Sequence, residues 1–339
     1  MNSKELVERT LAGDAVPRFP VGPLAVHYCA QLSGVTVRQY TSDSRVLADC
    51  VIRYCERFGP DAVWVSSDTW VNAQAMGVRV GAEDDNLPWG RLGPPPVRTA
   101  ADIDRIPGPD ISTQGRYPLM LDALRRISEA VGKEVFVVGC FDQYPFSLAT
   151  SLLGINETML AVADDPPLVR ALMERCLEYA MAYGTAMGQA GARLLSGGDS
   201  TAALMGPRLY RELALPFERR LIAGLKAAAG KPVSLHICGD ATPVLADMAT
   251  TGADVLEIDY QVDMARACDI VGPEITLWGN LDPVRVLLRG TPAEVDTAAR
   301  RAAGAVRARG HRRFVLSSGC TLAPDTPAEN LEALFKAVS

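Results

Sequence analysis

The 339-residue sequence lacks the features that would place a protein in a membrane or on nucleic acid. No stretch approaches the roughly 18 unbroken apolar residues of a membrane span. The amino end, MNSKELVERTLAGD, is a polar amphipathic helix pattern without the apolar segment of a secretory signal. The net charge is -6, whereas nucleic-acid-binding proteins usually carry a clustered basic surface. We therefore expect a cytoplasmic protein with neither membrane nor nucleic acid among its partners.

The sequence also has no glycine-rich dinucleotide fingerprint after its first apolar run, which argues against a doubly wound open sheet. Instead, short runs rich in Val, Ile and Leu alternate with helix-length amphipathic stretches, a pattern typical of βα units around a parallel sheet. Eight such runs predict a (β/α)8 TIM barrel of the α/β class. They span Phe19 to Val26, Ala62 to Ser66, Glu134 to Cys140, Ala192 to Gly198, Pro232 to Cys238, Val255 to Tyr260, Ile275 to Leu281 and Arg313 to Gly319.

We expect a single domain over residues 1–339, because barrels of this class often exceed two hundred residues as one unit. Predicted helices between the strands include Pro166 to Gln189, Pro207 to Ala228 and Pro292 to Arg309. One segment does not follow this alternation of strands and helices. Between the second and third strands, Asn72 to Gly115 contains PWGRLGPPPV and PGPD, which predicts a Pro- and Gly-rich insert that acts as a lid or binding loop.

In such a barrel the catalytic side chains project from the carboxyl ends of the strands, so the residues that close each apolar run are the first candidates. These candidates are Cys140, Asp142, Asp199, His236, Cys238, Asp259, Asn280, Asp282 and Cys320. The chain has eight cysteines and no secretory signal, which favours buried thiols, metal ligands or reactive groups over a disulfide framework.

The segment SLHICGD places His236 and Cys238 two residues apart on a strand, so both side chains point to the same face and can share one ion. Imidazole and thiolate are ligands that suit zinc. Cys320, in FVLSSGCTLAPDTP, can supply a third ligand if the loop after the eighth strand leans inward. Three protein ligands with an open fourth position are typical of a catalytic zinc site. Two thiolates offset the charge of the dication, which favours chemistry on an incoming thiol.

Other side chains complete the predicted site. Asp199 and Asp259 are carboxylates at strand ends that could orient a substrate or transfer a proton; capping of a helix is the alternative for each. Glu257 lies on the same face of its strand as Asp259, and one of the two could be the hydrogen-bonding partner that orients His236. His27 and Asn280 are candidates for substrate binding, although a core role for His27 is the stronger alternative.

The same stretches resemble the uroporphyrinogen decarboxylase superfamily, and within it the zinc-dependent methylcobamide:thiol methyltransferases of the coenzyme M type. The resemblance covers nearly the whole chain. GNLDP and the final TP-x-EN-x-x-A are similar to segments found throughout the superfamily, whereas H-x-C with a distant Cys is similar to the methyltransferase branch. The amino-terminal stretch RFPVGPLAVHYCAQLSG lacks the R-Q-A-G-R type motif of true decarboxylases.

The resemblance implies a barrel with zinc on His236, Cys238 and Cys320, and transfer of a methyl group from a methylated corrinoid to a small thiol. No D-x-H-x-x-G corrinoid signature is present, so the corrinoid would arrive free or on a small partner protein. The acceptor thiol, the upstream methyl donor, the fourth zinc ligand and the oligomeric state stay open. Two alternatives also remain: a decarboxylase of a small carboxylic acid that uses Asp199 or Asp259, and a non-catalytic corrinoid- or tetrapyrrole-binding barrel.

Overall fold

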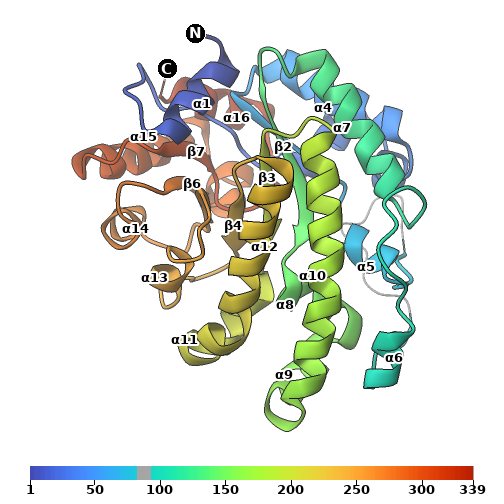
Figure 1. Cartoon of the computed structure of the whole chain (residues 1–339). Helices are drawn as coiled ribbons and strands as arrows, with labels where there is room; N and C mark the ends of the chain where they lie inside the picture. Colours follow the sequence, from blue (N-terminus) through green and yellow to red (C-terminus); the bar gives the residue numbers. More distant parts are fainter. Residues whose placement is uncertain (82–92, 339) are drawn as a thin grey trace.

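A parallel seven-stranded sheet forms the centre of the protein, with helices packed around it (Figure 1). The computed structural model describes residues 1–81 and 93–338. Each strand pairs with the next one along the chain, as expected for successive βα units. The last seven predicted strands are confirmed. They are β1 (Ala62–Val65), β2 (Phe136–Gln143), β3 (Leu194–Gly198), β4 (Ser234–Ile237), β5 (Val255–Ile258), β6 (Thr276–Leu281) and β7 (Phe314–Ser318).

The first predicted strand, Phe19 to Val26, is wrong in extent. Only Val21 forms a bridge, parallel to Leu316 of β7, and Val26 already begins a helix. This short segment still joins the two edges of the sheet. The amide of Gly22 donates to the carbonyl of Leu316 at 2.9 Å, and on the other side the amide of Asp61 donates to the carbonyl of Val21 at 2.9 Å. Prolines at positions 17, 20 and 23 remove the donors that a longer strand would need.

The helices cover the outside of the curled sheet (Figure 1). Their bounds are α1 (Ser3–Ala12), α2 (Val26–Ser33), α3 (Val37–Ser42), α4 (Ser44–Phe58), α5 (Val71–Ala75), α6 (Ala100–Asp104), α7 (Tyr117–Val131), α8 (Pro145–Leu153), α9 (Ile155–Asp164), α10 (Pro166–Gln189), α11 (Gly206–Leu209), α12 (Leu215–Ala229), α13 (Leu245–Met248), α14 (Met264–Val271), α15 (Pro292–Ala308) and α16 (Ala328–Lys336), with the shorter turns η1 (Ser200–Met205), η2 (Tyr210–Ala214) and η3 (Pro283–Leu288).

The long predicted helices show how proline acts at different positions. Pro166 opens α10 at its first residue, where its missing N–H costs nothing, and the predicted span is confirmed. The predicted helix from Pro207 to Ala228 is interrupted instead. Pro216 lies inside it, and the turn before it widens into the π-helix η2 between α11 and α12. A proline inside a helix cannot donate to the carbonyl four residues earlier, and a π-bulge accommodates that loss.

A buried aspartate holds the amino-terminal segment against the sheet. Asp61, directly before β1, accepts two hydrogen bonds from the guanidinium of Arg18 at 2.6 and 2.8 Å. The amide of Val21 and the hydroxyl of Ser3 donate to the same carboxylate at 2.8 and 2.7 Å. Only 3% of the Asp61 side chain is exposed. Removing this carboxylate would leave a half-buried cation unpaired, which makes Asp61 a stabilising group of the closed sheet.

The segment from Asn72 to Gly115 lies partly outside the described residues, since 82–92 contain most of PWGRLG. The described part contains most of α5 and all of α6, and the insert and its lid role stay predictions. The single-domain assignment also stays a prediction. In residues 1–81 and 93–338, no single helix is long and apolar enough to cross a membrane; α8 and α9 meet that length and composition only as a pair bent by 107°.

Candidate metal centre

Three soft ligand atoms meet where the strands end. His236 lies in β4, Cys238 follows that strand directly, and Cys320 follows β7. The imidazole Nε2 of His236 lies 2.9 Å from the sulfur of Cys238, and the two sulfurs are 3.9 Å apart. One ligand atom from each residue falls within 4.8 Å of the other two. The structure therefore brings together the three residues expected to bind zinc.

Cys320 reaches this group because Gly319 allows two segments of backbone to touch. A Cβ atom at Gly319 would lie 2.4 Å from the amide nitrogen of Tyr260, which follows β5. The amide of Gly319 also donates to the carbonyl of Leu281, at the end of β6, at 2.7 Å. The loop after β7 thus lies across the ends of two neighbouring strands. The inward lean that the sequence required depends on this glycine.

The spacing of the donors fits a tetrahedral zinc ion. With Zn–S bonds near 2.3 Å, two thiolates on one tetrahedron lie about 3.8 Å apart, and a nitrogen at 2.0 Å lies about 3.5 Å from each sulfur. The distance between the sulfurs of Cys238 and Cys320 is already 3.9 Å. The separation of 2.9 Å between His236 and Cys238 would have to open by about 0.6 Å. The two sulfurs thus already have the spacing of a zinc site, whereas the imidazole would have to move away from Cys238.

The polar groups behind the ligands fix the orientation of His236. Its Nδ1 donates to the backbone carbonyl of Glu257 at 3.0 Å, which makes Nε2 the nitrogen that faces the two thiols and could bind a metal. The carboxylate of Glu257 is itself held by the hydroxyls of Ser196 and Ser234, at 2.7 and 2.5 Å. Glu257 is the partner of His236, as expected for one of the pair Glu257 and Asp259, but it acts through its carbonyl and not its carboxylate.

Hydrogen bonds between the three candidate ligands shift their pKa values. A hydrogen bond from the thiol of Cys320 lowers the pKa of Cys238 against the effect of burial, and the same hydrogen bond together with burial raises the pKa of Cys320. Burial alone would lower the pKa of His236, but its hydrogen bond to Cys320 and its electrostatic interactions with Cys320 and Glu257 raise it to about 9. A metal binds only the deprotonated forms, so binding must release protons.

The structure buries both predicted catalytic carboxylates and pairs each with a backbone amide. Asp199 is fully buried, and its Oδ1 accepts the amide of Ser147 in α8 at 2.7 Å. Its carboxylate faces that of Glu218 in α12, and burial raises the pKa of both. Asp259 is also buried and accepts the amide of Gln261 at 2.9 Å. Both side chains therefore stabilise the turns that follow β3 and β5, and their catalytic roles stay predictions.

The remaining predicted residues have structural contacts as well. Asn280 donates to the carbonyls of Asp259 and Val262 at 3.1 and 2.7 Å, so it holds the turn after β5. His27 lies in α2 and donates from Nε2 to the carbonyl of Ser67 at 2.6 Å. Substrate binding by these two residues stays a prediction. The third histidine, His311, is buried after α15, and its amide donates to the carbonyl of Val306 at 3.3 Å.

Sequence reasoning missed a buried ion pair at the same ends of the strands. Asp68, which follows β1, is paired with Arg116, which precedes α7, and their side chains are only 2% and 11% exposed. Burial and the nearby charge of Asp68 raise the pKa of Asp142, whose carboxylate accepts the amide of Asn72 at 2.9 Å. The rule that selected residues at strand ends would have found Asp68 in SSDTW.

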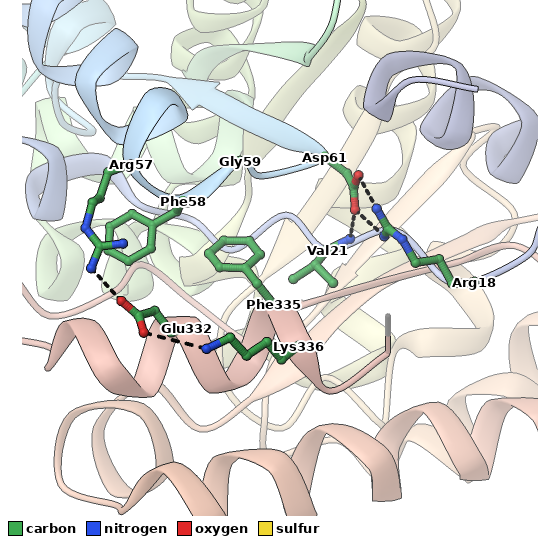
Figure 2. Close-up of a pocket in the computed structure, with 9 residues that line it drawn as sticks. All are labelled: Arg18, Val21, Arg57, Phe58, Gly59, Asp61, Glu332, Phe335 and Lys336. Atoms are coloured by element: carbon green, nitrogen blue, oxygen red, sulfur yellow. Dashed lines mark hydrogen bonds and ion pairs between the residues drawn. The ribbon is translucent and has the colours of Figure 1, made fainter.

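A cavity of about 500 Å³ lies at the opposite ends of the strands, between the residues before β1 and helix α16 (Figure 2). Its charged groups pair with one another. Arg57 and Lys336 both contact Glu332, at 2.5 and 3.8 Å, and Arg18 is bound by Asp61. In TIM barrels this face usually contributes to stability and the carboxyl ends of the strands carry the chemistry. The thiol cluster, and not this cavity, is therefore the candidate functional site.

The sequence matches a known protein family over nearly its whole length. Residues 2–339 match the family described as uroporphyrinogen decarboxylase (URO-D). The chain belongs to this family. It is 30% identical to the methylcobamide:CoM methyltransferase MtbA of Methanosarcina acetivorans, over 98% of this chain and 96% of that protein. It is 27% identical to the uroporphyrinogen decarboxylase of Chlorobaculum tepidum, over 100% of this chain and 98% of that protein.

A solved structure agrees with the fold. A methyltransferase from Methanosarcina mazei superimposes with a TM-score of 0.89 and 25% sequence identity, covering 99% of this chain and 98% of that one. The predicted family is confirmed by these matches. URO-D family members include both methyltransferases and decarboxylases, so the chemistry must be argued from the site.

Proposed function

We propose that this URO-D family protein is a zinc-dependent methyltransferase that moves a methyl group from a methylated corrinoid to a small thiol. The observation that carries the proposal is the meeting of His236, Cys238 and Cys320 within 4.8 Å at the ends of the strands. The likeness to MtbA over nearly the full length of both chains supports it. The corrinoid comes from outside the chain, either free or on a small corrinoid protein.

The side chains of the proposed site have different roles. His236, Cys238 and Cys320 would hold the metal, and the carbonyl of Glu257 fixes the ring of His236. When bound, zinc would lower the pKa of an incoming thiol and so favour its thiolate form. Two thiolates and one neutral imidazole balance the charge of a dication, so the site does not strongly quench a thiolate nucleophile. The turns after β3 and β5, held by Asp199 and Asp259, form the rim next to these ligands.

Zinc content tests the proposal first. We expect about one zinc per chain in the reduced protein, with the metal lost in His236→Ala and Cys320→Ser. The control is Cys268→Ser, which removes a buried thiol in α14 outside the cluster. The zinc-loaded protein is then mixed with methylcobalamin and either coenzyme M or homocysteine, and demethylation of the corrinoid is followed by absorbance. Absence of zinc in the wild type, or zinc unaffected by Cys320→Ser, would overturn the proposal.

A second candidate is a decarboxylase of a small carboxylic acid, which the likeness to the Chlorobaculum tepidum enzyme favours. In that case Asp259 or Asp199 would supply the acid and base, and Cys320 would be incidental. Release of carbon dioxide that survives Cys320→Ala would support this candidate. A protein that binds zinc and a corrinoid but never demethylates it in the presence of a thiol would instead be a binding barrel.

A further inference from the structure

A serine hydroxyl contacts one of the two candidate thiolates and not the other. The hydroxyl of Ser200 donates to the sulfur of Cys238 at 3.2 Å. Within residues 1–81 and 93–338, the sulfur of Cys320 has only His236 and Cys238 as hydrogen-bonding partners. The two sulfurs are therefore chemically unequal, although both would bind the same metal. The identity of the metal ligands does not require this asymmetry.

The backbone around Ser200 is held so that its hydroxyl faces the thiol. The amide of Asp199 donates to the carbonyl of His236 at 2.8 Å, and the carboxylate of Asp199 is anchored on the amide of Ser147. The amide of Thr201 donates to the hydroxyl of Ser147 at 3.1 Å. Residues 199 and 201 thus both bind α8, while the residue between them turns toward β4. The contact between Ser200 and Cys238 is fixed by the start of η1.

A hydrogen bond to a thiolate withdraws electron density from the sulfur and makes it a weaker nucleophile. This matters at a site that receives a reactive methyl group, because the ligand sulfurs compete with the substrate sulfur. Methylation of Cys238 would form an S–CH3 bond and leave a neutral thioether, which is a poor zinc ligand. A ligand thiolate that is less reactive than the substrate thiolate protects the enzyme from its own reaction.

We propose that Ser200 is a positioning residue that protects Cys238 from methylation by donating a hydrogen bond to its sulfur. The proposal rests on the proposed function, since it assumes that a methyl donor enters this site. It predicts that Cys320 is methylated faster than Cys238 in the wild-type protein. It also predicts that Ser200→Ala removes this difference, whereas Ser200→Thr, which keeps a hydroxyl, retains it.

The test uses zinc-loaded full-length protein and deuterated methyl iodide, from which the thiolate takes the methyl group as iodide leaves. Peptide mass spectrometry gives the ratio of label on Cys238 to label on Cys320. Loss of one hydrogen bond should raise this ratio about five-fold in Ser200→Ala, and Ser200→Thr should restore it. Thr158→Ala is the matched control, because it removes a buried hydroxyl in α9 that donates to the carbonyl of Gly154, outside the cluster.

A spectroscopic measurement separates this role from a general loss of packing. With cobalt(II) in place of zinc, the sulfur-to-cobalt charge-transfer band should move to longer wavelength in Ser200→Ala and stay in place in Ser200→Thr and Thr158→Ala. An unchanged labelling ratio in Ser200→Ala, or an equal rise in Thr158→Ala, overturns the proposal. If the wild type binds no zinc, the proposed function fails, whereas an unchanged ratio in zinc-loaded Ser200→Ala overturns only the role of Ser200.

Discussion

Replacing Gly319 with alanine should remove the metal while leaving every ligand in the sequence. The added Cβ would lie 2.4 Å from the amide nitrogen of Tyr260, and ordinary contacts begin at 3.4 Å, so the backbone must move by 3.4 - 2.4 = 1.0 Å. Zinc sites tolerate deviations of about 0.2 Å in ligand distance. A shift of this size at the residue next to Cys320 therefore takes its sulfur out of bonding range.

We expect the zinc affinity of Gly319→Ala to fall at least about 100-fold, the upper end of losses seen when the support of a ligand is removed. Crowding should also cost about 1–3 kcal/mol of unfolding free energy. Competition with a chromophoric chelator measures the affinity, and urea unfolding measures the stability. Gly304→Ala in α15 is the control, because a Cβ there meets no atom within 4 Å. Wild-type affinity in Gly319→Ala would refute the role assigned to this contact.

Two buried carboxylates, Asp199 and Asp61, give predictions about the unfolding free energy. Burial raises the pKa of Asp199 to about 6 from 3.8, so the stability it contributes as the neutral acid is present below pH 4 and is lost as the pH rises through 6. Asp199→Asn should reduce this loss of stability, which is about 3 kcal/mol at most. The unfolding free energy of both proteins is measured in urea at pH 4 and pH 7. An equal change between the two pH values in both proteins would contradict the assignment. Asp61→Ala should lower the unfolding free energy by about 3–5 kcal/mol, whereas Ser3→Ala, which removes one of the four hydrogen bonds, should cost about 1 kcal/mol. A loss in Asp61→Ala no larger than in Ser3→Ala would show that the pair with Arg18 contributes little.

The sequence predicts those parts of the site that depend on local periodicity. His236 and Cys238 share a face because side chains alternate along a strand, and β4 lies where the apolar run predicts it. The approach of Cys320 could not be predicted in the same way. It depends on the contact between Gly319 and Tyr260, two residues 59 positions apart that neither composition nor spacing connects. The role of Ser200 likewise depends on how η1 packs against α8.

Two errors in the predicted secondary structure have local causes. The first apolar run reads as a strand by hydrophobicity, but its prolines leave only Val21 with a bridge to β7. The helix after β3 reads as continuous, but Pro216 makes the chain adopt a π-helix before α12. The role of Glu257 shows a third limit, because a pattern of side chains does not indicate which residue will contribute its backbone carbonyl.

The bridge at Val21 also constrains the order in which the protein can be completed. Its partner, Leu316, lies 295 positions later in the sequence. During synthesis the two edges of the sheet therefore cannot be joined until residue 316 has left the ribosome. Until then, the edges of β1 and β7 have unpaired backbone groups that other chains can bind. The seam that closes the sheet is the last part to form, so a nascent or truncated chain is most prone to aggregation there.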